Sequence, residues 1–300
     1  MRHATFRQLE IFEAIARHGS FTRAAEALYL TQPTVSMQIK KLTDVAGTTL
    51  FEQVGKRIVL TEAGQDLAHA ARDIFAILER FEMTVAERQG LKRGRLRLVA
   101  ITTASYFAPR LLGAFCQRYP GIEVSLRVSN REQVLASMAD NLDDLYILGQ
   151  PPEDVDLVAL PFMENPLVVI AAPDHPLARG GQASLAQLAA EPWLMREAGS
   201  GTRKAIERLF AAHDLEIRPR LELGSNEAIK QAVLAGLGIS ALSSQALDLH
   251  PVGQFAIVPA EHFPIRRHWH VAYPAARTPS PAARSFVAFL MDGASTDRGP

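Results

Sequence analysis

Residues 20–45, SFTRAAEALYLTQPTVSMQIKKLTDV, decide the fold of the N-terminal part of the chain. Gly19 can end a preceding helix in the left-handed conformation, and Ser20 and Thr31 are good N-caps for two short helices. Pro33 falls in the first turn of the second helix, where a missing N–H costs little. The segment therefore predicts two helices joined by a tight turn.

The second of these helices has an apolar face and a polar face. Its buried side is marked by residues at helical spacing, Val35, Ile39, Leu42 and Ala46. Short polar groups near the start of the opposite face can reach base edges, and lysines suit phosphates. The pattern favours a DNA-binding helix-turn-helix over an ordinary helical hairpin with a solvated outer face. The predicted DNA contacts are Gln32, Pro33, Thr34, Ser36, Met37, Lys40 and Lys41.

The flanking segments indicate a winged form of this motif. An apolar stripe over residues 6–15 predicts a preceding helix, and residues 50–53 can pair with residues 57–60 as a hairpin. Lys56 and Arg57 would then lie near the tip of the wing and contact the DNA backbone. We expect residues 1–60 to form the DNA-binding domain. They contain eight Lys and Arg against five Asp and Glu, in a chain whose net charge is zero.

Residues 61–90, TEAGQDLAHAARDIFAILERFEMTVAERQG, predict one long amphipathic linker helix. Its apolar residues alternate at spacings of four and three, which is typical of a helix packed lengthwise against a partner. A small winged domain cannot cover this stripe alone, so we predict dimerisation with a second copy. Packing on the chain's own C-terminal part is the alternative. The stripe consists of Leu67, Ala71, Ile74, Leu78, Phe81 and Val85.

Strands and helices alternate beyond a hinge at residues 91–95, which argues for parallel sheets with helices on both faces. A late strand at residues 269–273 and a helix at residues 282–290 could return to the first sheet. The expected fold class is α+β with several domains, the C-terminal one comprising two subdomains and a cleft. We place the effector-binding domain at 96–293, with subdomain I at about 96–163 and 268–293, subdomain II at about 164–267, and a flexible tail at 294–300. The predicted strands are 96–101, 123–128 and 144–148 in one set, and 167–171, 193–196 and 238–242 in the other.

These residues resemble a known family. FRQLEIFEAIARHGSFTRAAEALYLTQPTVSMQIKKL and LFEQVGKRIVLTEAG are similar to the N-terminus of LysR-type transcriptional regulators. VSMQIKKL, RVSNREQVLASMADNLDDLYILGQPP, ENPLVVIAAPDHPLA and REAGSGTR resemble the CbbR-type subgroup, which regulates carbon-dioxide fixation through Calvin-cycle and RuBisCO operons. The resemblance covers nearly the whole chain.

The resemblance implies a winged helix-turn-helix, a linker-helix dimer often assembled into tetramers, and a periplasmic-binding-protein-like (type 2) domain of two Rossmann-like subdomains. It implies promoter DNA and RNA polymerase as partners. The effector would be a phosphorylated or redox metabolite: ribulose bisphosphate or another sugar phosphate, phosphoenolpyruvate, phosphoglycolate or NADPH. A LysR-type regulator of a different pathway, with a non-phosphorylated carboxylate effector, is the alternative.

An anionic effector needs backbone N–H groups at helix starts, hydroxyl donors and an arginine. Two segments that follow predicted strands supply them, 102–105 and 199–203, and an asparagine follows each of two other strands. Any single Thr, Ser or Asn among these residues could be an ordinary helix cap. The candidate effector-binding residues are Thr102, Thr103, Ser105, Asn130, Arg196, Gly199, Ser200, Thr202, Arg203 and Asn226.

Several function classes find little support. The nine histidines are scattered, and no nucleophile–base motif or metal-ligand spacing connects them, so we expect neither catalysis nor a metal or cofactor. An α/β metabolic enzyme with an N-terminal oligomerisation module is the remote alternative. Cys116, the only cysteine, is expected in the core. Met1 is followed by no apolar secretory or membrane-spanning segment, so we expect a cytoplasmic protein without membrane contact.

Overall fold

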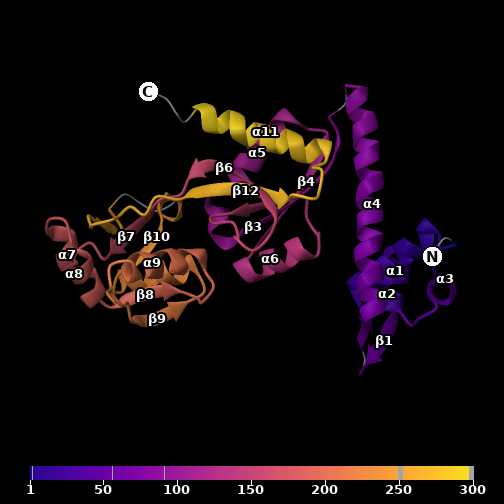
Figure 1. Cartoon of the computed structure of the whole chain (residues 1–300), viewed down its shortest axis with the longest axis horizontal. Coiled ribbons are helices and arrows are strands. Elements are labelled where there is room, and N and C mark those ends of the chain that lie inside the picture. Colours follow the sequence, from indigo (N-terminus) through magenta and orange to yellow (C-terminus); the bar gives the residue numbers. More distant parts are fainter. Residues whose placement is uncertain (2, 56, 91, 249–252, 297–300) are drawn as a thin grey trace. The chain divides into compact units, whose positions relative to one another are not determined.

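The computed structural model describes residues 1, 3–55, 57–90, 92–248 and 253–296 (Figure 1). The chain divides into two compact units, Met1–Glu82 and Met83–Pro300. This division differs from the domain borders expected at residues 60 and 90. The difference arises because the long helix takes part in both units: Ala68 and Ala71 are buried in the core of the first, and Met83 in a core of the second.

The N-terminal unit is a helix-turn-helix followed by a wing and the first part of the long helix. Ser20 accepts a hydrogen bond from the backbone N–H of Arg23, and Thr31 accepts one from that of Thr34, so both predicted N-caps are present. Gly19 ends the first helix with a φ of +61°. The elements are α1 (Phe6–His18), α2 (Phe21–Ala27), α3 (Gln32–Ala46), β1 (Phe51–Val54), β2 (Arg57–Leu60) and α4 (Glu62–Arg88).

The first subdomain of the C-terminal unit is built on a five-stranded sheet in the order β4-β3-β5-β12-β6. β3 is parallel to β4 and β5, whereas β12 runs antiparallel between β5 and β6. The late strand and the last helix therefore return to the first sheet, as predicted. The elements are β3 (Gly94–Ile101), η1 (Thr102–Tyr106), α5 (Ala108–Arg118), β4 (Ile122–Ser129), α6 (Arg131–Ala139), β5 (Leu145–Leu148), β6 (Leu157–Glu164), β12 (His268–Pro274) and α11 (Pro281–Thr296).

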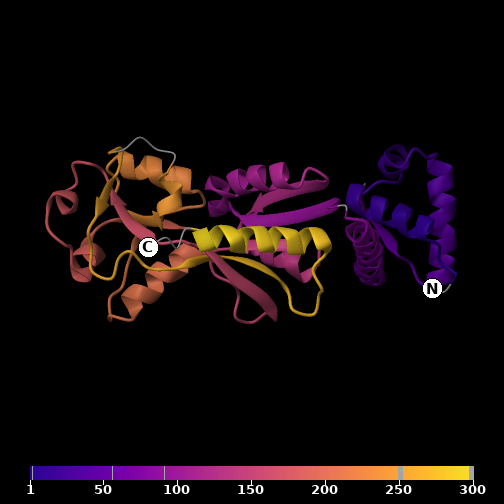
Figure 2. The same cartoon turned by 90° about the horizontal axis from the view of Figure 1, so that it is seen from above.

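Helices cover both faces of this sheet. α5 and α11 lie on one face and α6 on the other (Figures 1 and 2). Phe115 and Phe286 pack between α5, α11 and the sheet, and Val134 and Met138 of α6 fill a second core on the opposite face. The layers place the carboxyl ends of β3 and β5 at the edge where the subdomains meet.

The second subdomain corrects one prediction. Its three-stranded sheet, β10-β7-β11, is antiparallel throughout, and among the described strands of this subdomain only β8 and β9 form a parallel pair. The alternation of strands and helices predicted parallel pairing. Ile239 does form a parallel bridge to Trp193 at the start of β8, but the strand that follows it, β10, pairs antiparallel with β7. The elements are β7 (Leu167–Ala171), α7 (Pro176–Arg179), α8 (Leu185–Ala190), β8 (Trp193–Arg196), α9 (Gly201–Ala211), β9 (Pro219–Leu223), α10 (Asn226–Leu234), β10 (Ser240–Ser243), η2 (Ser244–Ala246) and β11 (Ala256–Val258).

Two chain segments cross between the subdomains, and they pair with each other. The N–H of Asn165 donates to the carbonyl of Arg267 at 2.7 Å, and Leu167 and Ile265 exchange two backbone hydrogen bonds of 3.0 Å. The crossing is therefore a hydrogen-bonded ribbon that extends β6 and β12 toward β7. Such a ribbon can bend while it keeps the register of its side chains.

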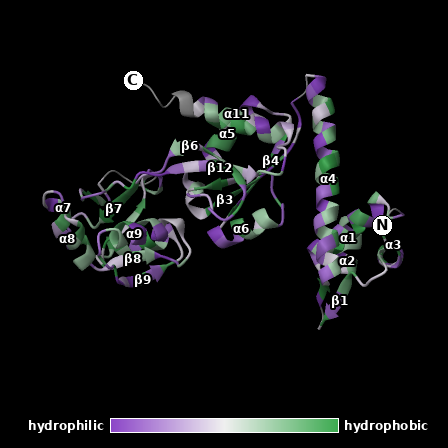
Figure 3. Ribbon diagram, viewed as in Figure 1, coloured by the Kyte–Doolittle hydropathy of each residue, from purple (hydrophilic) through white to green (hydrophobic). Residues whose placement is uncertain are grey.

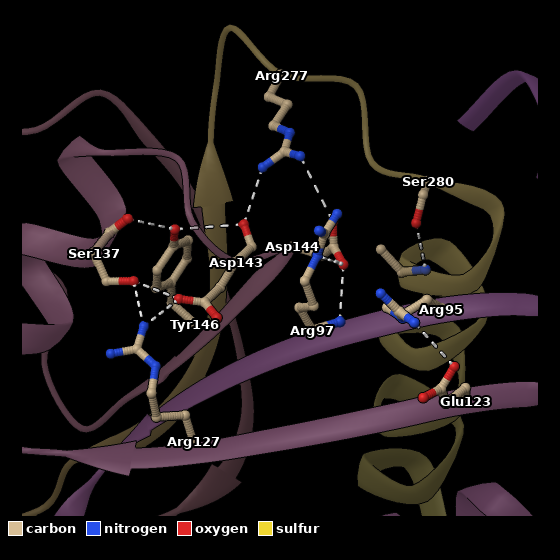
Figure 4. A network of polar contacts seen from close by, with 11 residues as sticks. Arg95, Arg97, Glu123, Arg127, Ser137, Asp143, Asp144, Tyr146, Arg277 and Ser280 are labelled. Carbon is tan, nitrogen blue, oxygen red and sulfur yellow. Dashed lines mark hydrogen bonds and ion pairs between the residues drawn. The ribbon is translucent and has the colours of Figure 1, made fainter. Parts of the chain in front are cut away.

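A polar network fixes the other end of the first sheet (Figure 4). Arg127 of β4 donates to the Asp143 carboxylate at 2.6 Å, and Ser137 of α6 donates to the same carboxylate. Arg277, which follows β12, donates to the Asp143 carbonyl at 2.9 Å and forms an ion pair with Asp144 at 3.6 Å. The network joins three elements to the start of β5, away from the subdomain boundary.

Three expectations about single segments need correction. Cys116 is exposed, because Phe115 takes the inward position in that turn of α5. The hinge expected at 91–95 is shorter, since β3 already begins at Gly94; residue 91 lies outside the described residues. The tail expected at 294–300 begins as helix, since α11 continues to Thr296, and residues 297–300 lie outside the described part.

Two helical glycines should respond in opposite ways to alanine. A Cβ on Gly64 would lie 2.1 Å from the carbonyl oxygen of Leu50, whereas a Cβ on Gly113 would meet nothing within 4 Å. We expect Gly113→Ala to stabilise its unit by about 0.5–1 kcal/mol, because Gly is unfavourable inside a helix. Gly64→Ala should destabilise the N-terminal unit by about 1–3 kcal/mol through overpacking. Urea unfolding followed by circular dichroism tests this pair, and equal stabilisation by both substitutions would contradict the expectation.

Candidate functional site

The DNA-contact candidates on α3 form a continuous outer face. Val35, Ile39 and Leu42 are buried, and the opposite side of the helix is accessible. Gln32 donates to the Ser36 hydroxyl at 2.9 Å, so these two side chains lie together one turn apart. The exposed candidates are Gln32, Pro33, Met37, Lys40 and Lys41, and the half-buried ones are Thr34 and Ser36.

The wing and the turn add further groups. Arg57 is exposed at the start of β2, opposite Val54; the candidate Lys56 lies outside the described residues. Tyr29, between α2 and α3, is 96% exposed and has a φ of +54°. A bulky residue in this conformation is uncommon. Sequence reasoning missed this aromatic ring beside the start of α3, because nothing in the local pattern marks it as exposed.

Hydrophobic and hydrophilic positions alternate along α4 (Figure 3), and the apolar stripe divides into a covered part and an exposed part. Ala71 is buried in the core of the N-terminal unit and Leu67 packs against that core, so neither is available to a second copy as predicted. Phe81 is 65% exposed, and Ile77, which the predicted stripe omitted, is 55% exposed. The exposed members of the predicted stripe are Ile74, Leu78, Phe81 and Val85.

A cavity lies where the two subdomains meet, at the ends of β3 and β8. Thr102 and Thr103 begin η1 directly after β3, and Ser200 caps α9 with Thr202 in its first turn. Hydroxyl-bearing residues of both subdomains thus line one space beside the starts of η1 and α9, as an anion site requires. The lining residues are Ile101, Thr102, Thr103, Arg131, Gly149, Gln150, Asn165, Arg196, Glu197, Ser200, Gly201, Thr202, Arg267 and Trp269.

Arg196 lines this effector cavity, but its guanidinium is already engaged. Its Nε and Nη2 each donate to the Glu197 carboxylate at 2.7 Å, and Nη1 donates to Asn226 Oδ1 at 2.6 Å. The Arg196 side chain is 4% exposed and that of Glu197 is 30% exposed, so solvent screens this pair only in part. The predicted anion clamp is therefore neutralised by its own neighbour in the chain.

Arg131 and Arg267 supply the uncompensated positive charge. In the described part of the chain neither forms an ion pair within 4.0 Å; Arg131 Nη1 donates to the Gln150 carbonyl at 2.5 Å, and Arg267 Nη1 donates to that of Gly201 at 3.2 Å. Burial lowers the pKa of Arg267 to about 10, and it also lowers the pKa of Arg131, partly offset by Asp154. Both stay protonated at neutral pH, so an anion in the cavity would be attracted by two half-buried cations.

Asn165 is the most unusual polar group of the cavity wall. The side chain is 1% exposed, and neither amide atom has a hydrogen-bond partner within the described structure. Trp269 Nε1 is likewise unpartnered. Buried polar groups are nearly always satisfied, so these atoms are available to a ligand or to water. Sequence reasoning missed both, although Asn165 lies at a subdomain crossing and Trp269 lies at the start of the strand next to the other crossing, locations that could have identified them.

Five predicted effector residues do not line the cavity. The Ser105 hydroxyl donates to the Thr102 carbonyl at 2.7 Å, and Asn130 caps α6 by accepting from the Gln133 N–H. Arg203 instead pairs with Glu207 and Glu222, and these hydrogen bonds raise its pKa. Gly199 precedes the cap of α9 without reaching the cavity wall, and Asn226 lies behind Arg196.

Metal ligation and membrane insertion find no structural counterpart in the described residues. Among them, no group of three or more His, Cys, Asp or Glu side chains is placed to hold a metal ion. None of the described helices has the length and hydropathy needed to span a bilayer.

Comparison with protein families gives two matches. A profile described as "LysR substrate binding domain" matches residues 89–295, and one described as "Bacterial regulatory helix-turn-helix protein, lysR family" matches residues 6–65. The HTH-type transcriptional activator CmpR of Synechocystis sp. is 50% identical over 291 residues, covering 97% of this chain and 96% of that protein. The RuBisCO operon transcriptional regulator of Acidithiobacillus ferrooxidans is 45% identical over 302 residues, covering 100% and 98%.

Solved structures agree with this fold. The regulatory domain of Synechocystis CcmR in complex with 2-PG is 52% identical, with a TM-score of 0.63, covering 66% of this chain and 96% of that one. A full-length OxyR variant from Pseudomonas aeruginosa has a TM-score of 0.77 at 23% identity, covering 97% and 95%. CbnR complexed with its target DNA has a TM-score of 0.70 at 20% identity, covering 96% and 99%. The last two likenesses concern the fold alone, and the predicted fold class is confirmed.

Removing the negative charge of Glu197 should strengthen anion binding. In Glu197→Gln the Arg196 guanidinium loses its counter-ion, so we expect inorganic phosphate to bind about tenfold more tightly, the equivalent of roughly 1.4 kcal/mol. Glu207→Gln is the matched control, because Glu207 pairs with Arg203 outside the cavity. Isothermal titration with phosphate measures both variants, and equal affinities in the two would show that Glu197 does not occupy the anion-binding arginine.

Proposed function

We propose, from the premise that this chain belongs to the LysR family of bacterial transcriptional regulators, that it controls carbon-dioxide-fixation operons in response to a small phosphorylated metabolite. The observation that carries the proposal is the effector cavity, where Arg131 and Arg267 lack carboxylate partners among the described residues. Relatives named for RuBisCO operons support the target, since they are similar over nearly the whole chain. Because the family comprises regulators, the enzyme alternative is set aside.

Phosphoglycolate is the effector that we favour among the four expected metabolites. The 52% identical CcmR regulatory domain was solved with 2-PG, which supports this choice. Two cations and the start of α9 suit a compact molecule with two anionic groups, here a phosphate and a carboxylate. The free volume of the cavity is only about 30 Å³, enough for roughly one or two water molecules. Phosphoglycolate would therefore have to open the subdomains before binding, as would ribulose bisphosphate, phosphoenolpyruvate and NADPH, which must also be tested.

The effector would act by changing the angle between the subdomains. Thr102 belongs to one subdomain and Thr202 to the other, while Arg267 lies on the ribbon that joins them. An anion held by all three would favour the conformation in which these groups converge. Ligand binding shifts the equilibrium only by its difference in affinity for the two conformations.

A thermal-shift experiment on the full chain tests the effector class. We expect 2-phosphoglycolate to raise the Tm, and Arg131→Ala to abolish that shift because one of the two unpaired cations is lost. Arg218→Ala is the control, since Arg218 is 89% exposed and lies away from the cavity. A shift with benzoate but with none of the phosphorylated metabolites would instead favour a carboxylate-responsive regulator of another pathway.

The outer face of α3 would enter the major groove of promoter DNA. Lys40→Ala should weaken binding about equally to all DNA sequences and reduce the salt dependence by about one phosphate contact. Thr34→Ala or Ser36→Ala should mainly alter sequence preference, because these short side chains lie where base edges would be read. Mobility shifts at several salt concentrations provide the measurement, with Arg218→Ala as a charge-matched control for Lys40→Ala. Binding unaltered in every α3 variant would contradict this assignment.

The exposed part of the α4 stripe would form the homodimer contact. We expect Phe81→Glu to weaken dimerisation by at least about tenfold, because an apolar anchor becomes a charge in a dry interface. Ile257→Glu is the control, since Ile257 is similarly exposed, at 57%, but lies on β11. Sedimentation equilibrium distinguishes the two variants, and a Phe81→Glu protein that remains fully dimeric would place the interface elsewhere.

Assembly into a homotetramer, contact with RNA polymerase and a cytoplasmic location complete the proposal. The homotetramer is what the family resemblance implies, and a role at promoters is consistent with contact with RNA polymerase in the cytoplasm.

A further inference from the structure

A second and much larger cavity lies beside the ribbon between the subdomains. Its volume is about 590 Å³, against about 30 Å³ for the effector cavity. Trp269 lines the effector cavity, whereas His268 and His270 line the second one, because successive side chains of β12 point to opposite faces. The lining residues are Gly149, Gln150, Ala205, Arg208, Leu209, Ala212, Ile265, Arg267, His268 and His270.

One face of α9 forms an apolar wall of this cavity. Ala205, Leu209 and Ala212 are spaced so that they share a face, while Ile206 and Phe210 on the opposite face fill the core. The two alanines are short, so this wall leaves room that larger residues would occupy. A volume of this size falls within the usual range of small-molecule sites, about 300–1,000 Å³.

The polar side of the cavity is positive. Two arginines and two histidines line it, and no aspartate or glutamate does. Glu153 approaches Arg208 only to 4.0 Å with both side chains well exposed, so this pair contributes little. The carboxyl end of α9 adds only about half a negative charge. The two arginine charges outweigh it, and the Nε of Arg267 has no hydrogen-bond partner in the described structure.

We propose that this cavity is a second small-molecule site, which binds an organic anion with an apolar or aromatic body. The anionic group would lie near Arg208 and Arg267, and the body would pack on Leu209 and Ile265. Arg267 lines both cavities, so an anion in either one would lessen the attraction for an anion in the other. This coupling is reciprocal by thermodynamic linkage.

The test uses two fluorescent probes of the same shape and different charge, on the full chain. One is the sulfonate 1-anilinonaphthalene-8-sulfonate, and the other is its neutral analogue N-phenyl-1-naphthylamine. Ala212→Trp should remove the saturable fluorescence of both, because it fills the cavity from an exposed position that tolerates a large side chain. Arg208→Glu should weaken the sulfonate at least tenfold and leave the neutral probe within about twofold. Arg218→Glu, a charge reversal outside the cavity, should change neither.

Three outcomes would overturn the proposal. Undiminished sulfonate binding in Ala212→Trp would place the probe elsewhere, for example on the exposed stripe of α4. Equal loss of both probes in Arg208→Glu would show that the cavity does not select anions. Loss of probe fluorescence as the chain self-associates at higher protein concentration would show that a second copy of the chain covers the cavity. Arg131→Ala separates this proposal from the first, because it should abolish the 2-phosphoglycolate response and preserve sulfonate binding.

Discussion

The backbone pairing between the two crossing segments is the constraint on which the effector-binding unit depends. The hydrogen bond from Asn165 to Arg267 and the two between Leu167 and Ile265 hold the crossings in one register. In that register Asn165 and Arg267 line the effector cavity, and His268 and His270, on either side of Trp269, line the second cavity. Two unpaired segments could each twist independently of the other. Because the two segments are paired, the ribbon that they form acts as one hinge, and bending it moves the walls of both cavities together.

The distribution of paired and unpaired charge explains how such a hinge could respond to a ligand. Tyr106 of the first subdomain donates to Glu227 of the second at 2.7 Å, and the buried Lys230 forms an ion pair with the same carboxylate. These contacts favour closure without any ligand. Arg267 would oppose it, because a half-buried guanidinium whose Nε is buried without a partner in the described structure is costly. In the proposed function, an anion would relieve that cost only when the cavity has formed around it, so the unpaired charge would couple binding to closure.

Short-range patterns predicted the DNA-binding half well. The caps at Ser20 and Thr31 and the buried positions of α3 depend on residues within one or two turns, and the structure contains them as expected. The same logic located Thr102 and Thr202, since each follows a strand and begins a helix. Asn165 and Arg267 could not be found in this way. They meet through strand pairing between residues about one hundred positions apart, and no local pattern encodes that register. The ion pair between Arg196 and Glu197 could not be predicted for another reason. It depends on side-chain rotamers, and two charged residues that are adjacent in a sequence need not contact each other.

The division of the α4 stripe changes the interpretation of its apolar residues, which are spaced alternately by four and three. Periodicity alone predicted one continuous interface, but Ala71 is buried among α1–α3 and the wing, while Phe81 remains exposed. Both residues belong to the same compact unit as the recognition helix. The covered half therefore fixes α4 to the helix-turn-helix, and the exposed residues up to Phe81 belong to the same compact unit. A second copy docked on Ile77 and Phe81 would consequently set the distance between two α3 helices. A small change in how the two α4 helices cross would then be transmitted to the spacing of the DNA half-sites that the pair can contact.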